Sequence, residues 1–331
     1  MSLDGPILRV VDLRVEFLTP EGTVHAVNGV SFSLRPGATL AITGESGSGK
    51  STVALSILNL LPPAGRITSG RVELKGADIL TLPSDELRSI RGREISIVFQ
   101  DPSTGLNPVL PAGTQVQETI TSHKAVSRRE ARRQAVQVLA RMGLPDPEDV
   151  AGRYPFQLSG GMSQRVMLAI ATALNPKVLI LDEPTSALDV TVQAAILDDL
   201  TRIQRQQATS ILLISHDLGI VAQMADDVAV MYAGTIVEQA PVRRLFATPR
   251  HPYTALLLAS RPRWDQEGPQ RLASIRGAPP NLLALPAGCP FLPRCNKATS
   301  RCRTEPAPPL EPLGNGHLVA CYNPVYHPAE G

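Results

Sequence analysis

The sequence predicts an α/β fold organised around a parallel sheet. Short apolar runs rich in β-branched residues alternate with helical patterns along the chain, which is typical of this class. Three of the strand candidates are nearly continuous apolar runs, as expected of strands that are covered on both faces. The 331 residues are enough for a substantial core and for about two domains.

The expected elements can be placed in order along the chain. The strand candidates are residues 38–44, 94–100, 177–183, 210–216 and 227–234. Between residues 101 and 175 the pattern is mainly helical, which indicates a helical subdomain inserted into the core. One helix within it, over 127–143, ends at Gly143, a residue suited to the position after a helix.

Composition argues against several classes of protein. A net charge of +2 gives no overall electrostatic attraction for nucleic acid. The longest apolar runs, residues 53–61 and 255–259, are far shorter than the roughly 18 residues that span a bilayer. Because the N-terminus has no hydrophobic signal region, we expect a protein made and kept in the cytosol, with any membrane role arising through partners.

The stretch "GESGSGKST" (44–52) lies between the first strand candidate and a helical run and matches G-x-x-x-x-G-K-[ST]. Its glycines let backbone N–H groups face phosphate oxygens, and the following helix adds its dipole. Lys50 supplies positive charge to the β- and γ-phosphates, and Ser51 a hydroxyl for Mg²⁺. The predicted ATP-binding residues are Gly44, Glu45, Ser46, Gly47, Ser48, Gly49, Lys50, Ser51 and Thr52.

Two further strand candidates end in polar residues suited to phosphate chemistry. In "KVLILDEPTSALD" (177–189), Asp182 can hold Mg²⁺ and the adjacent Glu183 can accept a proton from an attacking water. His216, after the next strand, can contact the γ-phosphate and that water. We therefore expect Glu183 and His216 to act in catalysis.

Two more stretches identify the family. "VFQDP" (98–102) and "YPFQLSGGMSQRV" (154–166) resemble the glutamine loop and the signature of ATP-binding cassette (ABC) proteins, and the motifs follow one another in that family's order. The resemblance implies a P-loop nucleotide-hydrolase core of the ABC type, with an N-terminal β-rich subdomain and an inserted helical subdomain. It places a nucleotide-binding domain over residues 1–257 and leaves 258–331 as a C-terminal extension.

The resemblance also implies roles in a dimer that sandwiches two ATP molecules. Gln100 would contact Mg²⁺ or the attacking water and act in catalysis, so that the magnesium set is Ser51, Gln100 and Asp182. The signature residues that would contact the partner's ATP are Ser159, Gly160, Gly161 and Gln164. The loop that would cross the dimer interface is Ala187, Leu188 and Asp189. The family's adenine-stacking aromatic has no counterpart near position 21, where His25 is a weak substitute.

Within the family, the chain resembles the ATP-binding subunits of bacterial dipeptide and oligopeptide importers, through "GLNPVL" (105–110), "HPYTALLLAS" (251–260) and "GAPPNLLALPAGCPFLPRC" (277–295). The resemblance implies ATP hydrolysis coupled to peptide import at the cytoplasmic face of the bacterial inner membrane. It also implies a second ATPase subunit, two permease subunits and an extracytoplasmic binding protein, with no nucleic acid. A nickel or oligosaccharide importer and a soluble ABC ATPase are the alternatives.

The extension has an unusual composition. Sixteen of the 30 prolines and all four cysteines follow residue 240. Cys289, Cys295, Cys302 and Cys321 have the spacing C-x₅-C-x₆-C-x₁₈-C, which lacks the short C-x₂₋₄-C of most zinc sites. In a cytosolic protein, clustered thiols indicate a metal site more than disulfides. Four thiolates suit a [4Fe–4S] cluster, and some peptide-importer ATPases carry one in this tail. Zinc and unligated thiols are the alternatives.

Overall fold

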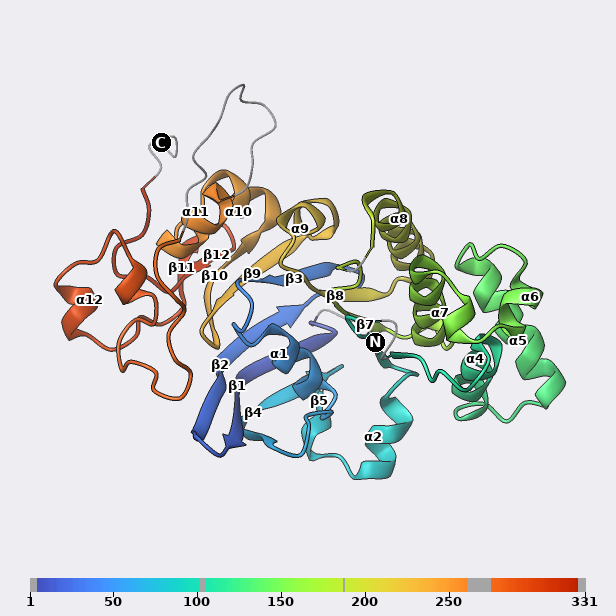
Figure 1. The fold of residues 1–331 in the computed structure, drawn as a ribbon. Helices are drawn as coiled ribbons and strands as arrows, with labels where there is room; N and C mark the ends of the chain where they lie inside the picture. Colours follow the sequence, from blue (N-terminus) through green and yellow to red (C-terminus); the bar gives the residue numbers. More distant parts are fainter. Residues whose placement is uncertain (1–4, 102–104, 187, 261–274, 327–331) are drawn as a thin grey trace, which may run out of the picture. The chain divides into compact units, whose positions relative to one another are not determined.

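The computed structural model describes residues 5–101, 105–186, 188–260 and 275–326 of the chain. By its contacts the chain divides into two compact units. Unit 1 consists of residues 1–8, 33–39 and 73–214, and unit 2 of residues 9–32, 40–72 and 215–331. Each unit is described by itself below, and Figure 1 labels the elements.

Unit 1 contains three parallel strands in the order β8-β7-β6, with β7 between the other two. These strands are β6 (Ile95–Val98), β7 (Val178–Asp182) and β8 (Ser210–Ile214). Every residue of β7 and β8 is buried, because parallel strands are covered on both faces. The register pairs Asp182 with Ile214, so that the predicted acidic residues follow the carboxyl end of the central strand.

The described helices of unit 1 begin in two ways: four of them follow a residue whose side chain accepts a hydrogen bond from a free backbone N–H group, and two follow a proline without such a cap. They are α2 (Ser84–Ile90), α4 (Ala112–Thr121), α5 (Arg128–Arg141), α6 (Pro147–Gly152), α7 (Gly160–Thr172) and α8 (Val190–Gln207), with the short turns η1 (Ile79–Thr81) and η2 (Pro155–Gln157). Ser127 caps α5 and Asp189 caps α8. Helices α4 to α7 pack on one another (Figure 1), so this stretch is helical as the sequence predicted.

Unit 2 contains two groups of strands. One has the order β2-β1-β4, and the other has the order β11-β12-β10-β9-β3. The short strand β5 (Ala77–Asp78) belongs to unit 1, where it pairs with Glu73 and Leu74. The strands of the two groups are β1 (Leu8–Thr19), β2 (Gly22–Leu34), β3 (Thr39–Thr43), β4 (Gly65–Leu74), β9 (Asp227–Tyr232), β10 (Thr235–Pro241), β11 (Glu311–Gly314) and β12 (His317–Val319). Strand β3 is parallel to β9, whereas β9, β10, β12 and β11 are antiparallel in turn. The second group is therefore a mixed sheet.

The helices of unit 2 are short. They are α1 (Lys50–Ile57), α9 (Leu218–Met224), α10 (Val242–Ala247), α11 (Pro252–Ala259) and α12 (Arg301–Thr304), with the turn η3 (Leu292–Arg294). In the extension this agrees with its many prolines, because proline interrupts a helix interior and α12 has only four residues. The extension nevertheless adds strand β12 beside β10, with Val319 paired to Glu238 (Figure 1). The sequence patterns did not predict that strand.

The five strands predicted from apolar runs are all present, each one to three residues shorter than expected. Helix α1 begins at Lys50, three residues earlier than the apolar run 53–61. In the described part of the chain no helix combines the length and apolar character needed to cross a membrane.

Candidate active site

The loop of residues 44–49 connects β3 to α1 in unit 2, and its shape depends on glycine. Gly44 and Gly49 have φ angles of 152° and 100°, a region that side chains rarely adopt. A Cβ atom at Gly44 would clash with the carbonyl oxygen of Met231, and one at Gly49 with that of Ala26. At Gly44 and Gly49 the backbone therefore passes too close to Met231 and Ala26 for any residue that has a side chain. The N–H groups of the loop lie just before the first turn of α1.

Lys50 is the first residue of α1, and its side chain folds back over the loop. It is 5% exposed, and its Nζ atom donates to the carbonyl oxygens of Gly44 and Glu45 at 2.9 Å each. The hydroxyl of Ser48 lies 3.5 Å from the same nitrogen. The loop thus surrounds one positive charge, which is the arrangement that phosphate binding requires. Ser46, Gly47 and Ser51 are exposed beside it.

In unit 1 two of the predicted catalytic residues are in contact. The Nε2 atom of Gln100 donates to Oε2 of Glu183 at 3.0 Å. Glu183 follows β7 directly and has a left-handed backbone with φ of 48°, and its N–H donates to the carbonyl of Ile214 at 2.9 Å. Non-glycine residues in this conformation are uncommon and often lie at functional sites. Asp182, the last residue of β7, is buried at 6% exposure.

The predicted signature residues lie at the start of α7 in unit 1. Ser159 and Gly160 are exposed, and the Ser159 hydroxyl accepts a hydrogen bond from the N–H of Met162 at 3.3 Å. Gly161 is required by packing, since a Cβ atom there would lie 2.7 Å from a methyl group of Val192. Gln164 is 1% exposed, so its side chain faces the interior of the unit and not a partner molecule.

The remaining predicted residues are placed as follows. Asp189 is exposed and caps α8, accepting from the N–H groups of Thr191 at 3.1 Å and Val192 at 3.0 Å. Leu188 precedes it and is half-buried, while Ala187 lies outside the described residues. His216 is exposed and belongs to unit 2, after β8 and before α9.

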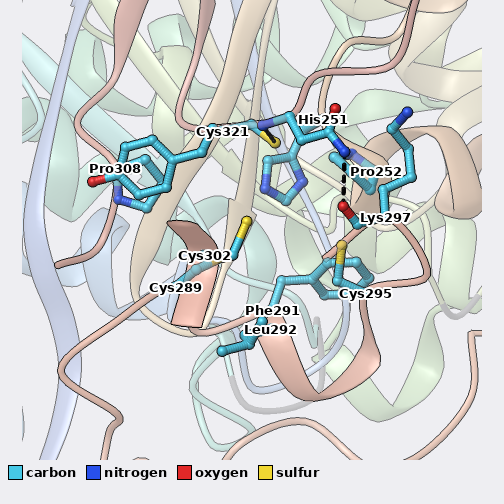
Figure 2. Close-up of a pocket in the computed structure, with 12 residues that line it drawn as sticks. His251, Pro252, Cys289, Phe291, Leu292, Cys295, Lys297, Cys302, Pro308 and Cys321 are labelled. Atoms are coloured by element: carbon cyan, nitrogen blue, oxygen red, sulfur yellow. Dashed lines mark hydrogen bonds between the residues drawn. The ribbon is translucent and has the colours of Figure 1, made fainter. Parts of the chain in front are cut away.

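The four cysteines line a single cavity in unit 2, together with His251 and Phe291 (Figure 2). The cavity measures about 20 Å³, which is room for about one water molecule. Among the described residues, no three histidine, cysteine, aspartate or glutamate side chains are arranged to hold one metal ion. The sulfur atoms are therefore neighbours around a cavity without forming the closed shell of a single-ion site.

Burial sets the ionisation of these groups. It raises the pKa of the Cys289 and Cys295 thiols and raises the pKa of Cys321 to about 11. Burial also acts on Cys302, but hydrogen bonds, including one from Thr299, outweigh it and lower the pKa of that thiol. Burial lowers the pKa of His251 to about 4, so the ring is neutral at pH 7. Its Nδ1 atom accepts from the N–H of Tyr253 at 3.0 Å.

The structure reveals contacts to the glycine-rich loop that sequence patterns did not indicate. The hydroxyl of Tyr253 accepts a hydrogen bond from the N–H of Glu45 at 2.8 Å, and the guanidinium of Arg294 pairs with the Glu45 carboxylate. The backbone N–H of His25 donates to the carbonyl of Leu282 at 3.0 Å. The extension therefore reaches both the loop and the segment where an adenine contact was expected.

Comparisons with known proteins agree with this geometry. A family model described as ABC transporter matches residues 27–186, and one described as oligopeptide/dipeptide transporter, C-terminal region, matches residues 237–302. The oligopeptide transport ATP-binding protein OppD of Salmonella typhimurium is 49% identical over 319 residues, which cover 96% of this chain and 94% of the relative. The dipeptide transport ATP-binding protein DppD of Bacillus subtilis is 47% identical over 318 residues, covering 96% and 94%.

Solved structures give the same fold. The ATP-binding cassette MJ0796, in a dimeric post-hydrolysis state bound to ADP and Pi, matches with a TM-score of 0.64 and 28% identity. The match covers 71% of this chain and 99% of that one. CbiO1 of Clostridium perfringens, part of the ABC transporter complex cbiONQ, matches with a TM-score of 0.63 and 30% identity, covering 74% and 92%. Both matches leave about a quarter of this chain uncovered.

Proposed function

The chain belongs to the ATP-binding proteins of oligopeptide and dipeptide ABC transporters, and we propose that it hydrolyses ATP to drive the import of di- or oligopeptides. The observation that carries this function is the combination, in one chain, of a glycine-rich loop closed around Lys50 with an extension that matches the oligopeptide/dipeptide model. The named relatives favour peptide over nickel or oligosaccharide as the solute.

The proposed chemistry assigns a role to each residue of the site. The loop 44–52 binds the phosphates of ATP, and the magnesium ligands are Ser51, Gln100 and Asp182. Glu183 accepts the proton of the attacking water. Its hydrogen bond to Gln100 supports this role, because the bond holds the Glu183 carboxylate beside a proposed magnesium ligand. His216 contacts the γ-phosphate. Catalysis then consists mainly of positioning and charge stabilisation.

The proposed assembly has a second ATPase subunit, two permease subunits and an extracytoplasmic binding protein, at the cytoplasmic face of the bacterial inner membrane. Exposed Ser159 and Gly160 support a role at an ATPase interface, since their backbone N–H groups stand at the free N-terminus of α7. ATP binding closes the dimer and hydrolysis reopens it. Asp189 and Leu188, with Ala187, line that interface.

A peptide-uptake measurement tests this function. The chain, its Glu183→Gln variant and an empty control are each expressed with a second ATPase subunit, two permease subunits and a binding protein of a peptide importer, and uptake of a labelled tripeptide is followed in whole cells. We expect uptake only with the unaltered chain, accompanied by ATP consumption. Peptide uptake that is equal in all three strains would refute the proposed function, as would uptake of nickel or an oligosaccharide in place of the peptide.

The four cysteines are proposed to hold a [4Fe–4S] cluster. Four thiolates around one zinc ion, each about 2.3 Å from the metal, would form one compact shell, and the described side chains contain no such shell. Four thiols around one cavity suit a [4Fe–4S] cluster, in which each thiolate binds a different iron atom. When bound, the cluster would cross-link a segment that has little apolar core.

Anaerobic purification followed by iron, sulfide and zinc analysis tests the cluster. We expect about four irons and four sulfides per chain, and their loss in a Cys289→Ser/Cys321→Ser double variant. One zinc per chain and no sulfide would show that the cysteines hold a structural zinc ion and not a cluster. A chain without metal would refute both.

A further inference from the structure

Glu45 is the second residue of the glycine-rich loop, and all three of its polar groups are engaged. Its N–H donates to the hydroxyl of Tyr253 at 2.8 Å, and its carbonyl oxygen accepts from Nζ of Lys50 at 2.9 Å. Its carboxylate accepts two hydrogen bonds from Arg294, at 2.7 Å from Nη1 and 3.0 Å from Nη2. This residue therefore links the extension to the lysine that serves the phosphates.

The charge of Glu45 poses a problem for a loop that binds a polyphosphate. The loop must attract several negative charges, and a carboxylate at its edge repels them over the short distances involved. Arg294 offsets this charge through a bidentate pair, the strongest geometry available to a carboxylate. The side chain of Arg294 is 5% exposed and that of Glu45 24% exposed, so water screens the pair only in part.

Arg294 has further hydrogen-bond partners besides Glu45. Its Nε atom donates to the carbonyl of Arg276 at 3.0 Å, and its Nη1 atom to the hydroxyl of Tyr232 at 3.3 Å. Below it, the rings of Tyr232, Tyr253 and Phe291 are fully buried, with centroids 4.7 to 5.4 Å apart. A guanidinium supported in this way can fix the loop, because its own position is set before any ligand arrives.

The extension also forms part of the wall beside the loop. Pro279, Pro280 and Leu282 line a small cavity with residues 45–48 of the loop, and the Leu282 carbonyl accepts the N–H of His25. Residues 279–294 thus approach the loop at two places, through this wall and through Arg294. A role in packing alone would not require a buried charge directed at a loop carboxylate.

We propose that Arg294 is a positioning residue of the ATP site, which neutralises Glu45 and holds the loop in the form that accepts phosphates. This inference rests on the ATP binding proposed above and adds the extension to that site. It predicts that removing Arg294 lowers ATP affinity because the charge of Glu45 is left unpaired. Removing that charge as well must then restore ATP binding.

The test compares ATP affinity in five full-length proteins, purified anaerobically and titrated with ATP and Mg²⁺ by calorimetry. They are the unaltered chain, Arg294→Ala, Arg294→Ala/Glu45→Gln, Glu45→Gln, and the control Arg301→Ala. Arg301 belongs to the same extension and stacks on the ring of Tyr322 at 4.2 Å, away from the loop. Thermal melting and iron content are measured for each, so that unfolding of the extension is detected separately.

We expect Arg294→Ala to bind ATP about tenfold more weakly, which corresponds to about 1.4 kcal/mol. The double variant should regain most of this loss, and Arg301→Ala should bind as the unaltered chain does. Glu45→Gln, which keeps Arg294 and the backbone bond to Tyr253, shows what removal of the carboxylate alone does to ATP affinity, and the double variant is compared with it. If Arg294→Ala fails to fold, Arg294→Gln takes its place, because it removes the charge but keeps a polar side chain in the same space.

Two outcomes would overturn the inference. They are unchanged affinity in the variant that removes the Arg294 charge, or no recovery in the double variant. Each would reduce Arg294 to a residue that only docks the extension. Failure of the unaltered chain to bind ATP is a different result, because it would refute the proposed function and not the role of Arg294.

Discussion

Strand β7 and the extension over residues 275–326 are held in place by different forces. All five residues of β7 are buried, and its neighbours β6 and β8 are apolar strands of the same kind. In the extension only Phe291, His317, Val319 and Ala320 are buried among the described residues. Its position depends instead on a few polar contacts to residues far away in the chain, such as Arg294 with Glu45.

The difference indicates which substitutions should destabilise each region. Burial of apolar area is non-directional and spread over many atoms, so a sheet strand tolerates moderate change. A buried polar contact is concentrated in two or three atoms, and loss of one partner leaves the other unsatisfied. Substitutions in the two regions should therefore differ in size and in kind.

The largest effect is expected at the end of β7, where chemistry and fold can be separated. Glu183→Gln keeps the shape of the side chain and can still contact Gln100, but it cannot accept a proton. We expect ATP turnover of the assembled transporter to fall by about 10²–10⁴, with ATP binding and thermal stability unchanged. A turnover rate equal to that of the unaltered complex would remove Glu183 from its proposed role.

The next effect is expected at Glu238, which anchors the extension. Its carboxylate is fully buried and accepts from the N–H groups of Arg250 at 2.6 Å and His251 at 2.9 Å, and it lies 2.6 Å from Nε2 of His317. Glu238→Ala leaves these groups unpaired and should lower the free energy of unfolding by about 3–5 kcal/mol. Denaturant unfolding measures this, with exposed Glu311→Ala as the control.

If both glutamate variants were equally stable, the view that polar contacts hold the extension would be wrong. Local proteolysis sharpens the comparison further. In Glu238→Ala, cleavage should begin after residue 250 and leave β7 protected, because His317 of β12 loses its side-chain contact with Glu238 of β10.

A similar loss of stability is expected in the core of unit 1, where it is distributed over many apolar contacts. Ile180 is fully buried at the centre of β7. Ile180→Ala should lower the free energy of unfolding by about 2–5 kcal/mol, whereas Ile180→Val should cost only about 0.5–1.5 kcal/mol. Equal losses for the two variants would show that the strand is not close-packed, and the contrast with the extension would disappear.

The smallest effect is expected at an exposed pair on α5. Two hydrogen bonds from Arg133 and one from Gln134 lower the pKa of Glu130 to about 2. Because this pKa is lower in the folded than in the unfolded chain, the stabilisation is present above pH 4.5 and is lost as the pH falls towards 2. The small difference in melting temperature between the unaltered chain and Glu130→Gln should vanish over that range. A difference that persisted at pH 2 would mean that the pair contributes nothing through its charge.

The sequence alone determined the parts of this protein whose geometry follows from neighbouring residues. Continuous apolar runs can be buried only as covered strands, and they placed β3, β6, β7, β8 and β9. The loop at 44–52 was equally predictable, because its motif stands between a strand and a helix and supplies glycine where the backbone has positive φ angles. The pattern of motifs identified the family.

Only the tertiary structure decided the contacts that join residues far apart in the chain. No pattern near Arg294 indicates that it pairs with a carboxylate 249 residues away, and none near Val319 predicts a strand beside Glu238. Gln164 belongs to the same motif as exposed Ser159 and Gly160, yet its place on α7 buries it. Periodicity describes which face of an element is apolar, whereas the partner of a polar group depends on how the whole chain folds back on itself.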